Sequence, residues 1–163
     1  MAVFQFCTPE WLEKLQKTYN SDPGNERFFK GVTASLCYKV LAEPEGGIEE
    51  DIIFGHEVFE GKLLWSKFVT EEEAKKCTFV FSAPPNTWKK LLRKEGEFMI
   101  EMVLGDLRQE HGDKSALIGL TPYVDPLLEF MAKVELQFPD EMSPDELERY
   151  KTHMKEFREK LGV

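Results

Sequence analysis

The residues of this sequence best suited to acid–base chemistry near neutral pH are its three histidines. His56 directly precedes Glu57, so a histidine and a carboxylate are neighbours within an expected strand. A strand sends neighbouring side chains to opposite faces, however, so these two groups would not act together on one substrate. We expect a surface or cross-strand histidine at position 56. We expect His111, in a turn, and His153, on a C-terminal helix, to be solvated.

The other groups that could carry chemistry lack the neighbours that such chemistry needs. No cysteine or histidine pair has the spacing of a metal site, and the glycines mark turns without forming a phosphate-binding loop. Cys7, Cys37 and Cys77 are widely spaced in apolar runs, which predicts buried, reduced thiols. The acidic runs at 49–51 and 71–73 are typical of a solvated face. We therefore predict no catalytic residue, no metal site, no cofactor and no enzymatic activity.

The composition narrows the class of protein. The chain has 163 residues, of which 42% are hydrophobic and 31% charged, as in ordinary globular proteins. Its net charge of -9 argues against a nucleic-acid partner, because phosphate binding needs clustered basic side chains. The sequence shows no signal peptide and no apolar run long enough to cross a membrane. We expect a single cytoplasmic domain over residues 1–163, without stable membrane insertion.

The first elements that could position a site are a helix and a three-stranded meander. Thr8, followed by a proline and a glutamate, is a typical helix start and predicts a helix over about residues 8–20. Apolar and polar side chains alternate over 32–41, which predicts a half-buried strand. Turn signals then separate two partner strands, at 48–59 and 62–69. Strands followed by helices predict an α+β fold.

The stretch from Cys77 to Met131 supplies most of the expected apolar surface. Its pattern predicts, in order, a strand, an amphipathic helix, a helix that is apolar at six of seven positions, a short strand and a last apolar helix. These elements are expected at 77–83, 87–94, 98–104, 107–110 and 116–131. That is more apolar helix than one sheet face usually needs. Either the core is large, then, or something besides protein fills part of it.

A C-terminal helix is expected over about residues 143–161. Ser143 and Glu146 have the spacing of a capping box, and Gly162 follows the last helical residue. The apolar face of this helix is a thin stripe, so we expect it to pack on the surface and to lie outside the core. The stripe consists of Leu147, Tyr150, Met154, Phe157 and Leu161.

The chain from about residue 28 to residue 131 resembles the type-2 sterol carrier protein family of lipid-binding domains. The resemblance is carried by the meander, by Thr78-Phe-Val-Phe-Ser with the Trp88-Lys-Lys-Leu-Leu helix, by Phe98-Met99 in a helix leading to Leu104-Gly-Asp-Leu-Arg, and by the helix from Leu117 to Met131. Two features depart from the family pattern. Its basic strand reads here as Asp-Leu-Arg-Gln-Glu-His, with acidic residues interleaved, and the two terminal helices have no clear counterpart.

The resemblance implies a five-stranded, mostly antiparallel sheet covered by helices, with an apolar tunnel between sheet and helices. Such a tunnel would hold a fatty acid, an acyl derivative or a sterol-like molecule, for binding and transfer without catalysis. The residues expected to line it are bulky or adaptable apolar side chains. They are Phe79, Phe81, Trp88, Phe98, Met99, Met102, Leu117, Leu120, Tyr123, Leu127 and Met131.

Three other interpretations of the same residues stay open at this point. The apolar side chains could fill an ordinary core. They could instead form an apolar groove of a dimerisation or accessory interaction module, and the partner in that groove could be a second copy of the chain, giving a homodimer. In the third, His56 with a neighbouring carboxylate would serve a small-molecule enzyme, and a polar pocket around His56 would indicate it.

Overall fold

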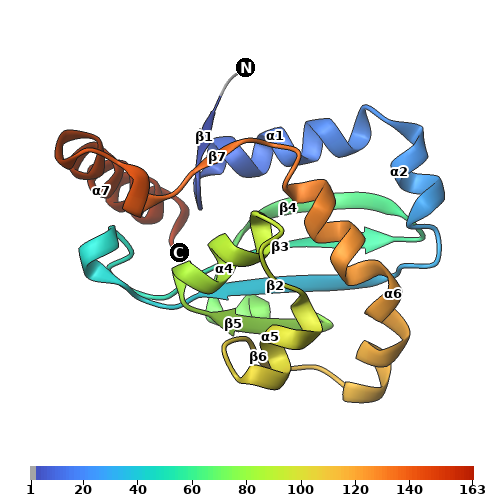
Figure 1. Ribbon diagram of the computed structural model, residues 1–163. Helices are drawn as coiled ribbons and strands as arrows, with labels where there is room; N and C mark the ends of the chain where they lie inside the picture. Colours follow the sequence, from blue (N-terminus) through green and yellow to red (C-terminus); the bar gives the residue numbers. More distant parts are fainter. Residues whose placement is uncertain (1–2) are drawn as a thin grey trace.

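A five-stranded sheet forms the centre of the computed structural model, which describes residues 3–163 (Figure 1). The strands lie side by side in the order β4-β3-β2-β5-β6, and every neighbouring pair is antiparallel except β2 with β5. The expected α+β fold with a mostly antiparallel five-stranded sheet is therefore confirmed. The strands are β2 (Ala34–Val40), β3 (Ile52–Phe59), β4 (Lys62–Val69), β5 (Phe79–Ala83) and β6 (Arg108–His111).

The alternation along β2 determines which side of the sheet carries the main core. Leu36 and Tyr38 point to the inner face and join the large apolar cluster, whereas Cys37 joins a smaller cluster on the outer face. The hairpin between β3 and β4 turns at Glu60 and Gly61, whose φ angles are 47° and 84°. Positive φ at both central residues is the turn geometry that matches the twist of a hairpin.

Helices cover the inner face of the sheet. The buried sides of α1, α4 and α6 all belong to the same apolar cluster as the inner residues of β2. Thr8 caps α1 by accepting a hydrogen bond from the Trp11 amide, as its position predicts. The longer helices are α1 (Pro9–Asn20), α2 (Pro23–Phe28), α4 (Pro85–Leu92), α5 (Phe98–Leu104), α6 (Lys114–Met131) and α7 (Pro144–Leu161), and α3 (Glu71–Ala74) is a single turn.

The expectation that α7 lies outside the core is wrong. Tyr150, Met154 and Phe157 are buried in the main cluster, and the Tyr150 hydroxyl donates a hydrogen bond to the Phe6 carbonyl at 2.7 Å. The N-terminal segment supplies this packing partner, because β1 (Phe4–Gln5) pairs in parallel with β7 (Leu136–Gln137) and lies close to α7 in Figure 1. A thin stripe therefore suffices for burial when its members are aromatic and meet another buried segment.

Two strand boundaries also differ from the pattern. β3 begins at Ile52 and not at residue 48, because a 3-10 turn (Pro44–Gly46) and a bridge between Glu43 and Ile48 take up the preceding residues. β6 extends to His111, which was expected in a turn. Within residues 3–163, no helix combines the length and the hydropathy needed to cross a bilayer.

Candidate functional site

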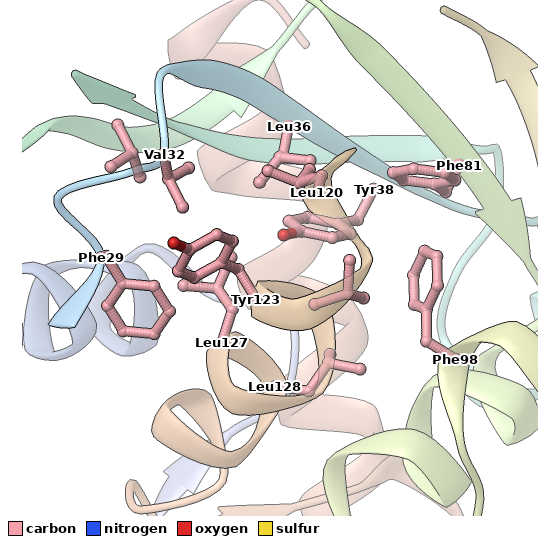
Figure 2. Close-up of a pocket in the computed structure, with 12 residues that line it drawn as sticks. Phe29, Val32, Leu36, Tyr38, Phe81, Phe98, Leu120, Tyr123, Leu127 and Leu128 are labelled. Atoms are coloured by element: carbon pink, nitrogen blue, oxygen red, sulfur yellow. The ribbon is translucent and has the colours of Figure 1, made fainter. Parts of the chain in front are cut away.

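A narrow apolar cavity lies between the inner face of the sheet and α6 (Figure 2). The space inside it is small, about 10 Å³ for the centre of a water molecule, roughly the room of one water. The apolar tunnel that the resemblance implies stays a prediction, because the structure shows only this narrow cavity between the sheet and α6. The wall consists of Phe29, Val32, Leu36, Tyr38, Val58, Phe81, Phe98, Leu120, Tyr123, Val124, Leu127 and Leu128.

Part of the residue set predicted from the sequence meets at this cavity. Phe81, Phe98, Leu120, Tyr123 and Leu127 line it. The remaining predicted residues lie outside its wall, four of them buried in the same core and the two methionines half-buried against it. These are Phe79, Trp88, Leu117, Met131, Met99 and Met102. That any of the eleven contacts a ligand stays a prediction.

Seven wall residues were not predicted from the sequence: five lie on β2, β3 and the segment before β2, and Val124 and Leu128 lie on α6. Leu36, Tyr38 and Val58 project from β2 and β3 into the cavity, and Phe29 and Val32 come from the segment that joins α2 to β2. A signal for three of them was present, because the alternation over 32–41 places Val32, Leu36 and Tyr38 on one face. The predicted wall residues all lie after residue 77.

Only two side chains of the wall carry polar atoms, and both are tyrosines. Figure 2 shows the hydroxyl oxygens of Tyr38 and Tyr123 in the space between the strand and helix residues. The Tyr38 hydroxyl is hydrogen-bonded to His56 Nε2 at 3.0 Å. Tyr123 is half-buried and passes over Gly31, where an added methyl group would lie 2.5 Å from its hydroxyl oxygen. Tyr38 is therefore the deep polar group and Tyr123 the outer one.

His56 is a cross-strand histidine, but it is buried and does not reach the surface. It lies opposite Leu36 in the β2–β3 pair, and burial lowers its pKa from the ordinary 6.5 to about 4. Glu57 points to the other face of the sheet and accepts a hydrogen bond from the Trp65 indole at 2.9 Å. The histidine–carboxylate pair of the enzyme hypothesis is therefore not assembled, and His56 stays uncharged near neutral pH.

The structure also shows where the two other histidines and the three cysteines lie. His111 is exposed at the end of β6, whereas His153 is half-exposed and lies 2.8 Å from a carboxylate oxygen of Glu10. Cys7, Cys37 and Cys77 are buried and unbridged, as expected, and burial raises the pKa of the Cys7 and Cys37 thiols. Among residues 3–163, no cluster of three or more potential ligand side chains could hold a metal ion.

Helix α6 covers the cavity and contains two interior prolines, Pro122 and Pro126. Proline has no amide hydrogen, so the carbonyls of Ile118 and Pro122 lose the donors that a regular helix would supply. Thr121 donates its hydroxyl to the Leu117 carbonyl at 3.1 Å, an arrangement that often bends helices. The cover of the cavity is therefore a helix whose hydrogen-bond ladder is interrupted in the middle.

Helix α5 contributes less to the cavity than its apolar sequence predicts. It buries Phe98 and Glu101, and the Glu101 carboxylate forms an ion pair with Lys90 of α4 at 2.6 Å. Three of its apolar side chains face solvent: Ile100, Val103 and Leu104 are 50%, 86% and 63% exposed. Part of the apparent surplus of apolar helix therefore lies on the surface.

Several solved structures share the fold of this chain. A crystal structure of sterol carrier protein 2 superposes with a TM-score of 0.71 at 20% identity, covering 80% of this chain and 99% of that one. A conserved hypothetical protein of Thermus thermophilus, described as possibly a sterol carrier protein, gives 0.69 at 19% identity over 84% and 94% of the two chains. Apo sterol carrier protein 2 from Yarrowia lipolytica gives 0.54 at 8% identity, over 80% and 96%. No protein-family model and no curated protein matches the sequence. The chain has the fold of sterol carrier protein 2.

Proposed function

We propose that this protein binds a single long apolar molecule, a lipid, between α6 and the inner face of the sheet, without altering it chemically. The observation that carries the proposal is the apolar cavity beneath a helix whose own hydrogen bonding is interrupted. The fold supports it as well, since two of the solved proteins that share it are named as sterol carriers.

The ligand enters by displacing α6 outward, because the closed cavity has room for about one water. Each buried methylene contributes about 0.8 kcal/mol, so about ten of them contribute roughly 8 kcal/mol, which corresponds to micromolar affinity. The free energy needed to open the cavity is subtracted from that figure. If the open state had a population of about 1%, the apparent affinity would be about 100-fold weaker than the intrinsic one.

The wall is suited to holding a molecule and lacks the groups needed to convert it. Ten of the twelve lining side chains are hydrocarbon, and the Tyr38 hydroxyl is uncharged near neutral pH because burial raises its pKa well above the ordinary value of 10. Tyr38 has a neutral histidine beside its hydroxyl, but burial raises the pKa of this phenol and so disfavours the phenolate that nucleophilic attack would need. Retention and release of an intact lipid therefore fit the site better than catalysis.

A displacement titration tests the proposal. A fluorescent long-chain lipid, prepared both as the acid and as the alcohol, should bind in a saturable way with one site per chain and a Kd in the micromolar range. Unlabelled lipids of similar length should displace it, and native mass spectrometry of freshly purified protein should show a co-purifying small molecule. If neither probe gives a saturable, displaceable signal, the cavity is part of an ordinary core and the proposal fails.

A further inference from the structure

Resting on the proposed function, we infer that the Tyr38 hydroxyl, positioned by His56, binds the uncharged polar end of the ligand, so that the cavity selects alcohols or esters over carboxylates. Tyr38 would be the residue that touches the ligand. His56, which is not part of the cavity wall, would act through Tyr38 as a positioning residue.

The surroundings of Tyr38 hold its hydroxyl in one place. The ring lies 5.2 Å from the Phe54 ring and 5.6 Å, edge to face, from the Trp88 indole. Trp88 is itself fixed, because its indole N–H donates to the Lys39 carbonyl at 3.1 Å. With the ring packed on two sides and its oxygen bonded to His56 Nε2, the hydroxyl cannot rotate away from the cavity that it lines.

The hydrogen-bond capacity of Tyr38 is only partly used. A phenol hydroxyl donates one hydrogen bond and accepts two, and the bond to His56 occupies one of these positions. If His56 Nε2 accepts, the Tyr38 oxygen can accept a hydrogen bond from a ligand hydroxyl. If Nε2 carries the proton, the phenol hydrogen is free for a ligand carbonyl. The pair thus accommodates either an alcohol or an ester without any change in charge.

A carboxylate finds no positive charge at this place. None of the twelve wall residues is basic, and Lys39, the neighbour of Tyr38 in β2, points to the outer face, where it pairs with Glu71 and Glu110 at 2.9 and 3.1 Å. Burial lowers the pKa of His56 to about 4, so the histidine supplies no positive charge near neutral pH. Burying an unpaired carboxylate beside this pair is strongly unfavourable.

The test compares ligands of equal chain length that differ only at the polar end. Hexadecanol, methyl hexadecanoate and, at about pH 8, hexadecanoate compete against the fluorescent probe on the full-length protein. Wild-type protein should bind the alcohol and the ester at least about 10-fold more tightly than the carboxylate. Tyr38→Phe should weaken hexadecanol binding roughly 2- to 12-fold, the range expected for one hydrogen bond, and should leave hexadecanoate binding nearly unchanged. The matched control Tyr150→Phe, at a buried tyrosine outside the wall, should keep the wild-type ratio of the two.

Measurements on the histidine test the positioning role and remain informative if Tyr38→Phe does not fold. His56→Leu should lower the preference for the alcohol, and His56→Gln, which keeps a hydrogen-bonding group, should restore part of it. In wild-type protein, the ¹⁵N signal of His56 Nε2 should shift when hexadecanol is added. An unchanged alcohol-to-acid ratio in folded Tyr38→Phe, or a wild-type preference for hexadecanoate, would overturn the inference while leaving lipid binding intact. Failure of every probe to bind the wild type would overturn the proposed function itself.

Discussion

Replacing Val124 by phenylalanine should fill the cavity and exclude the ligand. Val124 projects from α6, is 7% exposed and lines the cavity. The substitution adds about four carbon atoms, whereas the closed cavity has room for about one water. The unliganded protein should therefore lose about 1–3 kcal/mol of stability through overpacking. At about 0.8 kcal/mol per methylene, the lost space should weaken lipid binding by about 3 kcal/mol, or roughly 100-fold.

The assay pairs thermal melts with displacement titrations and includes a control at a half-buried position outside the wall. Met102 packs against the same core from α5 but does not line the cavity, so Met102→Phe should change lipid affinity less than about three-fold. Val124→Leu serves as a second control. It adds about one methylene, which the cavity can hold, and it should therefore leave stability within about 1 kcal/mol of wild type. Wild-type lipid affinity in a folded Val124→Phe variant would refute the assignment of this cavity as the binding site.

Three further predictions follow from particular contacts. Burial lowers the pKa of His56 from 6.5 to about 4, so the unfolded chain binds the proton more tightly. The free energy of unfolding should therefore fall by up to about 3 kcal/mol as the pH drops from about 6.5 to about 4, and urea melts of His56→Gln should lack this part of the loss. Gly31→Ala should destabilise the protein, because its methyl group would lie 2.5 Å from the Tyr123 hydroxyl oxygen. Adding Tyr123→Phe should relieve this clash. Equal urea-unfolding midpoints for the single variant Gly31→Ala and the double variant would contradict this. Pro122 is exposed and lies outside the wall, so Pro122→Ala should stabilise α6 by restoring a backbone amide donor. The variant should show slower hydrogen exchange along α6 and slower lipid release. Faster exchange along α6 would contradict the role given to the proline.

The sheet could be predicted from the sequence because its signals are local. Period-two alternation identified β2, turn residues placed the β3–β4 hairpin, and capping residues placed the starts of α1 and α7 within one residue. The burial of α7 could not be predicted in this way. It depends on contacts such as the one between Tyr150 and Phe6, which are separated by 144 positions, and nothing in the spacing of an apolar stripe says what the stripe will meet.

The candidate site was only partly predictable for a related reason. Residues 98–104 are apolar at six of seven positions, so their periodicity defines no buried face, and α5 in fact buries Glu101 while exposing Val103. Contacts with neighbouring helices determine which side of α5 is buried. Lys90 pairs with the Glu101 carboxylate, and Asp125 of α6 accepts a hydrogen bond from the Phe98 amide at 3.3 Å. A charged residue can thus be buried within an apolar run when a neighbouring helix supplies its counter-ion.

A closed apolar cavity does not by itself distinguish a binding site from a core, and the difference at this place lies in helix α6. A regular helix resists bending because every residue in its middle contributes a backbone hydrogen bond. In α6 two of these bonds cannot form, because Pro122 and Pro126 have no amide hydrogen for the carbonyls of Ile118 and Pro122. Bending α6 away from the sheet therefore breaks fewer hydrogen bonds than it would in an unbroken helix. A lower cost of opening leaves more of the apolar burial energy to appear as affinity for the lipid.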